Sequence, residues 1–188
     1  MLLSTLNYVN KMKTEELLAD ALKNLIFDES LDNITVQRLS DYCNIKRQTF
    51  YYHFRDIYDL ITWIFLNETS LINKETKDWK EMVSNMVKYV NKNKKFVKHI
   101  LDSSARDLFE QFVHSYFFST LLKQFVALDK TNKFTSEEKR FYVTYYVSGM
   151  TSCVILWIDQ GMKEKKEELI NRLEQLNSGF IPSLIKYK

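Results

Sequence analysis

Apolar residues recur at helical spacing along nearly the whole chain, and this pattern predicts an all-α protein. The first helix is expected over residues 15–27, with Thr14 as its N-cap. Its acidic residues fall on one face. Its apolar residues share the opposite face: Leu17, Leu18, Ala21, Leu22, Leu25 and Ile26.

Two short helices are expected next, after a polar turn at residues 28–34. Thr35 can cap the first of them, which runs through Tyr42, and the second covers residues 46–54. Residues 43–45 form a tight break between the two. Asn44 suits this break, because asparagine tolerates the left-handed backbone conformation that ends helices.

Longer helices are expected in the rest of the chain, the first of them beginning near Asp56. Thr135 and Glu138 have the spacing of a capping box, so another helix starts there and ends at Gly161. The remaining helices cover residues 79–91, 94–102, 106–128 and 163–178. We place the domain boundary after position 56, which predicts one domain at 1–56 and a second at 57–188.

Glycine occurs only three times and proline once, which argues against a turn-rich β protein. No glycine precedes Gly149. A Walker-type or dinucleotide-binding loop is therefore excluded before that position, since both need glycine to let the backbone approach phosphates.

Cys43 and Cys153 stand far apart, with no Cys or His pair near either, so neither a disulfide framework nor a zinc site is expected. Residues 1–10 lack the basic start and apolar run of a signal peptide. The longest apolar stretch, residues 153–158, is too short to span a bilayer. We expect a soluble cytoplasmic protein without a membrane partner.

Basic residues gather in one short segment of a region that is close to neutral overall. Residues 1–58 carry seven Lys or Arg and eight Asp or Glu, and the whole chain has a net charge of +3. Between positions 37 and 55, Asp41 alone opposes four cations: Arg38, Lys46, Arg47 and Arg55. This local excess fits a nucleic-acid partner, and it fits an ordinary solvated surface equally well.

Two short helices joined by three or four residues are typical of the helix-turn-helix, whose second helix enters the major groove of DNA. The second predicted helix begins with Lys46, Arg47 and Gln48, a position from which side chains can reach base edges. Phe50 and Phe54, four residues apart, are the natural inward anchors. The alternative is a small amphipathic helix with a solvated basic face.

The same segment resembles the N-terminal DNA-binding domain of the TetR family of transcription regulators. The resemblance covers residues 10–65, and three stretches carry it: Thr35–Leu39, Asn44–Asp56 and Asp59–Leu60. The family pattern is a Thr-capped helix, a Gly-Val turn, and a Thr-Leu/Phe-Tyr-x-x-Phe helix followed by a hydrophobic Leu.

Residues 47–51, together with 63–65, further resemble the branch that contains dihydroxyacetone-kinase regulators. The resemblance implies a three-helix N-terminal domain with a helix-turn-helix, followed by a helical bundle for dimerisation and for sensing a ligand or partner.

The resemblance also implies which residues touch double-stranded DNA. The second short helix would face the bases and clamp the phosphate backbone, helped by the start of the first. The expected set is Thr35, Gln37, Arg38, Lys46, Arg47, Gln48, Thr49, Tyr51, Tyr52, His53 and Arg55. Two departures are notable. Asn44 replaces the usual Gly, and Ile57 stands where many members have a phosphate-binding Lys, so Arg55 is the candidate to replace that contact.

The helix expected at 134–160 is apolar on most faces, which predicts burial on more than one side. Ser148, Gly149 and Ser152 form a small patch where another helix could approach closely. We predict that this helix and the last one pair with their two-fold mates in a four-helix homodimer interface. The expected interface residues are Tyr145, Met150, Val154, Trp157, Leu169, Leu173 and Leu176.

Candidate effector-pocket residues are aromatic or polar-tipped: Trp79, His99, Phe112, Tyr116 and Tyr145. Each of them is more often plain core or surface than a ligand contact. The histidines lack metal-ligand spacing, and no nucleophile–base pair or close acidic pair stands out. We therefore expect no catalytic site, no metal and no cofactor.

The leading hypothesis is a homodimeric regulator that binds a near-palindromic operator and responds to a small-molecule effector. A variant takes its signal from a partner protein, and it predicts a filled C-terminal core. A rival from another class is an all-α enzyme or lipid carrier, whose DNA binding would be absent or insensitive to salt. The operator sequence, the effector and the choice between repression and activation stay open.

Overall fold

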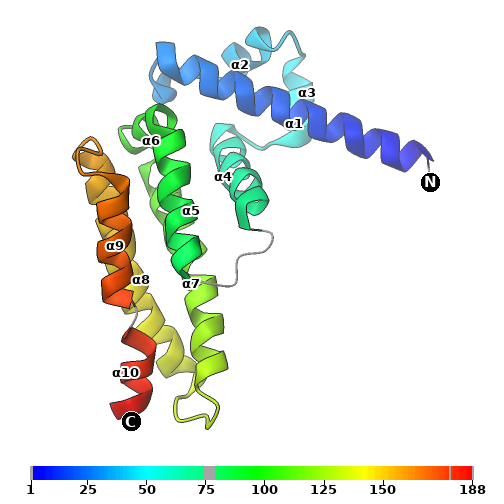
Figure 1. The fold of residues 1–188 in the computed structure, drawn as a ribbon. Helices are drawn as coiled ribbons and strands as arrows, with labels where there is room; N and C mark the ends of the chain where they lie inside the picture. Colours follow the sequence, from blue (N-terminus) through cyan, green and yellow to red (C-terminus); the bar gives the residue numbers. More distant parts are fainter. Residues whose placement is uncertain (1, 74–78, 178, 188) are drawn as a thin grey trace. The chain divides into compact units, whose positions relative to one another are not determined.

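The structure is a computed structural model that describes residues 2–73, 79–177 and 179–187, and side chains within 13–69, 80–176 and 179–187. No strand occurs among these residues, which confirms the all-α prediction. The elements, shown in Figure 1, are α1 (Leu2–Asp28), η1 (Leu31–Asn33), α2 (Val36–Tyr42), α3 (Arg47–His53), α4 (Ile57–Asn73), α5 (Trp79–Lys92), α6 (Lys94–Leu101), α7 (Arg106–Leu128), α8 (Ser136–Asp159), α9 (Lys166–Asn177) and α10 (Phe180–Tyr187).

The chain forms two compact units, and they do not follow a single cut in the sequence. The first unit contains residues 1–68 and 95–109, and the second contains residues 69–94 and 110–188. The predicted domain at 57–188 therefore contributes residues 57–68 and 95–109 to the first unit. What each domain does stays a prediction.

The first unit is built on the apolar face of α1. Leu18, Leu22 and Ile26 are fully buried, at the four-residue spacing that keeps side chains on one face of a helix. Helix α2 packs against α1, and α3 packs against α2. Leu39 of α2 and Phe50 of α3 are fully buried as well.

Helices α4 and α6 complete this first unit. The ring of Phe65 in α4 lies 6.0 Å from Phe96 and 5.2 Å from Phe109, measured between centroids, and all three rings are buried. Lys23 of α1 forms an ion pair with Glu68 of α4. These contacts join residues 31 to 45 positions apart in sequence, so local patterns could not reveal them.

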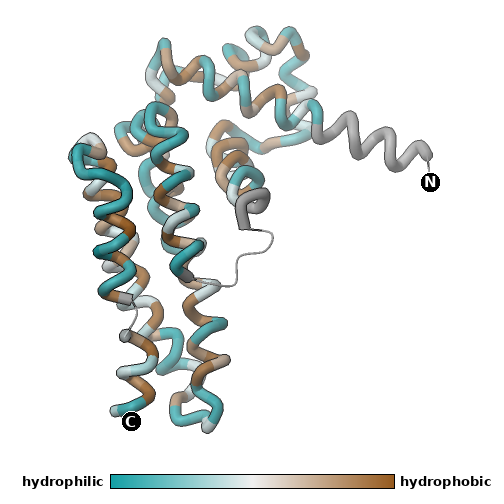
Figure 2. Tube along the Cα trace, viewed as in Figure 1, coloured by the Kyte–Doolittle hydropathy of each residue, from teal (hydrophilic) through white to brown (hydrophobic). Residues whose placement is uncertain are grey.

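The second unit is a bundle in which α5 lies beside α9. Its core contains residues of α7 at four-residue spacing, Phe117, Leu121 and Phe125, all buried. Figure 2 shows apolar and polar residues alternating along these helices, as expected for amphipathic helices with one buried face.

Helix α8 begins as the sequence predicted, with a complete capping box. The Thr135 side chain accepts a hydrogen bond from the Glu138 backbone N–H, and the Glu138 carboxylate accepts one from the Thr135 backbone N–H. By length and composition alone, α8 is the one helix in the described residues that could cross a membrane. This is weak evidence for a span, because buried residues of the bundle such as Val143, Val147 and Val154 account for much of its apolar character.

Two helices differ from the prediction. Helix α1 begins at Leu2 rather than near residue 15, and α10 was not predicted. Gly179 and Pro182 suggest that the last helix ends before this segment, yet proline is tolerated in the first turn of a new helix. The Phe180 ring stacks on Tyr146 of α8 at a centroid distance of 4.0 Å, a contact that attaches α10 to the bundle.

A buried ion pair fixes the turn between α7 and α8. Asp129 is buried; its carboxylate lies 2.9 Å from the Lys139 ammonium and accepts hydrogen bonds from the backbone N–H groups of Lys133 and Phe134. The bond from Lys139 is the main reason that the pKa of Asp129 lies below its usual 3.8. Three donors from two segments thus converge on one carboxylate.

We expect Asp129→Asn to lower the midpoint of thermal unfolding by several degrees, because Lys139 would keep a buried charge without a counter-ion. Far-ultraviolet circular dichroism measures this. The pKa of Asp129 is lower in the folded protein than its usual 3.8. The ionised carboxylate therefore stabilises the fold fully above pH 3.8, and this stabilisation is lost as the pH falls through the lowered pKa.

The matched control is Asp102→Asn, which breaks the exposed pair between Lys98 of α6 and Asp102, the residue that follows this helix. Exposed pairs contribute little, so its midpoint should stay close to that of the wild type. Equal midpoints for the two variants would contradict the role assigned to Asp129.

Candidate nucleic-acid interface

Helices α2 and α3 are joined by the tight turn that the sequence predicted. The Thr35 hydroxyl accepts a hydrogen bond from the Arg38 backbone N–H and so caps α2. Asn44 has a φ of 52°, which confirms the left-handed conformation. The Ile45 N–H donates to the Ser40 carbonyl at 3.0 Å, and this bond closes the turn.

One side of α3 is anchored in the core of the first unit. Phe50 is fully buried and Phe54 nearly so, with their centroids 5.9 Å apart. The Phe54 ring also meets Trp63 of α4 edge-on at 5.9 Å. These contacts confirm that the two phenylalanines face inward, and they leave the opposite side of α3 to solvent.

The exposed side of α3 carries most of the predicted DNA contacts. Lys46, Arg47 and Gln48 are exposed, and so are Tyr51 and Tyr52, the latter at 77% of its surface. Thr49 is half-buried beside them. Hydroxyl, amide and cationic groups thus share one accessible surface.

Three other predicted contacts are already engaged inside the protein. Arg38 donates to Glu29 at 3.0 Å, Arg55 pairs with Asp59 at 3.0 Å, and Gln37 donates to Asp41 at 2.8 Å. The hydrogen bond with Asp59 raises the pKa of Arg55, and the same bond lowers the pKa of Asp59.

Glu29 and Asp59 lie outside the segment 37–55, so the local charge excess overstated the free positive charge. In the described part of the chain, no acidic residue pairs with Lys46 or Arg47. The positive charge available to a polyanion on this face is therefore concentrated at the beginning of α3.

His53 differs from its neighbours on α3 because its side chain is largely buried, and its predicted phosphate contact stays a prediction. Its side chain is only 5% exposed, and Nδ1 lies 3.5 Å from the Glu15 carboxylate of α1, out of line for a hydrogen bond. His53 therefore links α3 to α1 instead of standing on the exposed face. Ile57 is buried at the beginning of α4, which explains why an apolar residue occupies that position.

A second exposed surface lies on α8 and α9. Of the residues predicted for a dimer interface, Tyr145 and Leu176 are exposed, at 74% and 66%. The other five are buried within the single chain, where they hold the bundle together: Met150, Val154, Trp157, Leu169 and Leu173. Sequence reasoning missed two exposed apolar residues of α8, Phe141 and Leu156, which the same helical spacing could have identified.

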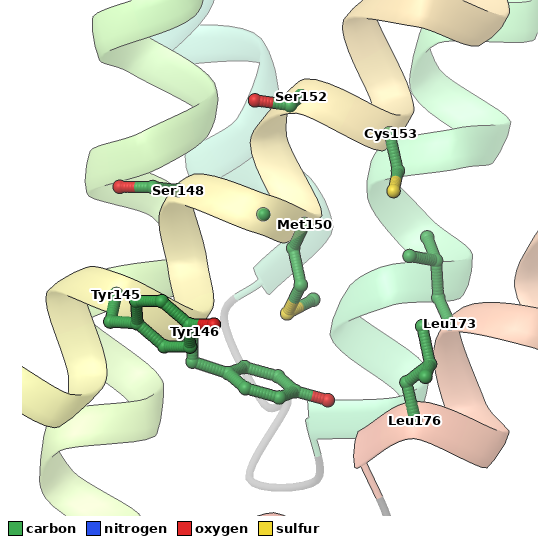
Figure 3. A pocket seen from close by; sticks show the side chains of 9 residues that line it. Tyr145, Tyr146, Ser148, Met150, Ser152, Cys153, Leu173 and Leu176 are labelled. Atoms are coloured by element: carbon green, nitrogen blue, oxygen red, sulfur yellow. The ribbon is translucent and has the colours of Figure 1, made fainter.

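A groove of about 560 Å³ runs between α8 and α9 on this surface. Figure 3 shows Tyr145 and Tyr146 at one end, Cys153 toward the other, and Leu173 and Leu176 across from Met150. The Tyr146 hydroxyl is buried without a hydrogen-bond partner in the described residues. Burial, with a smaller effect of Cys153, raises the pKa of Tyr146 to about 12, so this group stays a protonated donor.

The predicted effector-pocket residues are only partly brought together. Phe112 and Tyr116 of α7 are in ring contact at 6.2 Å, and Phe112 also meets the buried ring of Tyr89. The Tyr116 hydroxyl donates to the Met82 carbonyl, so its polar tip is engaged inside the bundle. Tyr145 lines the α8–α9 groove instead.

Two pocket candidates stand apart from that cluster. His99 lies on α6, in the first unit, and the Trp79 side chain lies outside the described residues. Among the residues that the structure describes, no group of three or more His, Cys, Asp or Glu could hold a metal ion, and both cysteines are free thiols.

The sequence is similar to that of known transcriptional regulators. The sequence model of a family described as a transcriptional regulator C-terminal region matches residues 77–179, more than half of the chain. The chain is 28% identical over 98 residues to the HTH-type dhaKLM operon transcriptional activator DhaS of Lactococcus lactis subsp. lactis (strain IL1403). That match covers 50% of this chain and spans about half of the relative, 52% of its length.

Two solved structures have a similar fold. The dihydroxyacetone kinase operon activator DhaS superimposes with a TM-score of 0.66 at 25% identity, covering 93% of this chain and 97% of that one. The fatty acid degradation regulator FadR from Bacillus halodurans gives a TM-score of 0.59 at 17% identity, covering 86% and 93%. The second likeness concerns the fold alone.

We expect Thr35→Ala to lower the free energy of unfolding by about 1 kcal/mol, because the Arg38 backbone N–H would lose its side-chain cap. Urea denaturation followed by circular dichroism measures the change. Thr35→Ser keeps the hydroxyl and should recover most of the loss. If the alanine and serine variants were equally destabilised, the cap would not be the cause.

Proposed function

Since the chain belongs to the TetR family of transcriptional regulators, we propose that it binds a near-palindromic DNA operator as a homodimer. The observation that carries this proposal is the two-sided construction of α3. Its phenylalanines are buried, while Lys46, Arg47, Gln48, Tyr51 and Tyr52 share the exposed side. A helix held in this way can enter a major groove as a rigid body.

In the proposed complex, the α3 helices of two subunits lie in successive major grooves, about 34–36 Å apart. Lys46 neutralises phosphate, and the neighbouring polar side chains contact phosphate oxygens and base edges. An effector acts by changing the spacing of the two DNA-binding domains, and a coupling of about 1–3 kcal/mol changes affinity by up to roughly 150-fold. The Lactococcus lactis relative is named an activator, whereas the proposal covers activation and repression alike.

We propose the exposed stripe of α8 as the centre of the dimer interface. Phe141, Tyr145 and Leu156 stand on one face of the helix, with the small residues Gly149 and Ser152 between them. Large exposed apolar residues are costly in water and often mark an interface. Small residues at the middle of the stripe allow two helices to approach closely.

A second version keeps the DNA-binding role but takes the signal from a partner protein. It is supported by the packing of Phe112 and Tyr116, which fill space between α5 and α7 and engage the Tyr116 hydroxyl. Residues that pack in this way act as core rather than as the lining of an open effector pocket.

We also infer that the protein is not an enzyme and acts in the cytoplasm. The support is that its relatives are transcription regulators. The tests of DNA binding and of assembly below address the function directly.

We expect affinity for DNA to fall steeply with salt, and Lys46→Ala to reduce the slope of log affinity against log salt by about 2 for the dimer. The physical reason is the loss of one phosphate contact per subunit. Fluorescence anisotropy with duplexes selected from a random library measures both quantities. Tyr51→Ala should weaken binding as well.

The matched control is Lys130→Ala, which removes an exposed lysine from the second unit and should leave the slope unchanged. Unchanged operator affinity in both Lys46→Ala and Tyr51→Ala would refute the assignment of these residues to the DNA-binding face.

We expect the protein to be a dimer at micromolar concentration and Tyr145→Glu to shift it toward monomer, because a charge would be buried in an apolar interface. Analytical ultracentrifugation measures the distribution. Tyr52→Glu makes the same chemical change at an exposed tyrosine of α3 and should stay dimeric. A monomeric wild-type protein would rule out this interface.

A further inference from the structure

We propose that Arg47 is the residue that recognises a guanine base in each half of the operator, and that Tyr51 positions it. This inference rests on the proposed function, because it assigns a task within the same DNA-binding face. It concerns which side chain distinguishes one DNA base from another, whereas other side chains of this face bind phosphate alone.

Arg47 is the first residue of α3, and Tyr51 follows one turn later on the same side of the helix. An Nη2–H of Arg47 donates to the Tyr51 hydroxyl at 2.9 Å, and the guanidinium carbon lies 5.3 Å from the centre of the Tyr51 ring. The guanidinium is thus held by a hydrogen bond and a cation–π contact together.

The tyrosine is itself held by the core. Its ring meets the fully buried Phe50 edge-on, with a centroid distance of 5.7 Å and an interplanar angle of 87°. A continuous set of contacts therefore runs from the hydrophobic core through Tyr51 to the guanidinium. Because the long arginine side chain is restricted before DNA arrives, less conformational entropy is lost on binding.

The remaining donors of Arg47 fit guanine. A guanidinium carries five N–H groups, and the bond to Tyr51 uses one of them. A parallel pair of donors remains, and this geometry matches the O6 and N7 acceptors of guanine in the major groove. No acidic residue in the described part of the chain forms an ion pair with the Arg47 guanidinium.

The neighbouring cations do not have this combination of properties. Lys46 precedes the helix in extended backbone and carries a point charge on a flexible stem, which suits a phosphate. Arg38 is bound to Glu29, and Arg55 is bound to Asp59. Arg47 is the arginine of this face whose fork is positioned and still has a free edge.

The first experiment compares binding sites that wild-type protein and Arg47→Lys select from random duplex DNA. Lysine keeps the charge and loses the planar fork. We expect the preference for one G·C pair per half-site to weaken in the variant, by up to about 150-fold, because lysine can reach O6 and N7 but lacks the planar fork that fits both together. Non-specific affinity and the salt dependence should stay the same, because the charge is retained.

The second experiment replaces that guanine with 7-deazaguanine, which removes the N7 acceptor. Wild-type affinity should fall, and Arg47→Lys affinity should fall less, because a lysine does not depend on O6 and N7 together. Tyr51→Phe keeps the ring and removes the hydroxyl, so it should weaken discrimination at the same base pair and at no other. Gln48→Ala is the control, and its effect should fall on a different base pair.

Two results would overturn the inference while leaving DNA binding intact. One is the same guanine preference in Arg47→Lys as in the wild type. The other is a reduced salt slope in Arg47→Ala without any change in base preference, which would make Arg47 a phosphate contact. If the wild type enriched no sequence at all, the proposed function itself would fail. The 7-deazaguanine test on the wild-type protein holds even if a variant is poorly folded.

Discussion

The burial of Phe50 and Phe54 is the constraint on which the exposed face of α3 depends. Burying a side chain of this size contributes about 1.5–3 kcal/mol, enough to fix one side of a seven-residue helix that would not be stable alone. Once that side is fixed, helical geometry turns Tyr51 and Tyr52 to solvent and His53 toward α1. The ring of Tyr51 packs against Phe50, so the core also determines where Arg47 lies.

Ion pairs determine which cations on this face remain without a negative partner. The cations of the helix-turn-helix look equivalent in sequence, yet Arg38 is bound to Glu29 and Arg55 is bound to Asp59, two acids outside the segment 37–55. Their pairing lowers the positive charge available to phosphate while leaving Lys46 and Arg47 unneutralised. A domain of almost no net charge can therefore present a small positive surface at the beginning of α3, because the acids lie beside Arg38 and Arg55.

The apolar residues of α8 fall into two groups, one buried and one exposed. Val143, Val147 and Val154 belong to the core of a single chain, whereas Phe141, Tyr145 and Leu156 stand in solvent. In sequence both sets read as one helix that is apolar on most sides, and this is why buried residues such as Trp157 were predicted at an interface. The Trp157 indole N–H donates to the Glu164 carbonyl, and this bond fixes it within the chain.

The sequence by itself determined the helical class, the caps at Thr35 and Thr135, the left-handed Asn44 and the inward pair of α3. All of these depend on residues a few positions apart, so spacing and propensity reveal them. The tertiary structure alone decided that His53 turns toward Glu15, that Arg38 is paired with Glu29, that α6 belongs to the first unit and that Phe180 attaches α10 to α8. Each of these depends on side chains that folding brings together from different segments. No periodicity within one segment encodes such a contact.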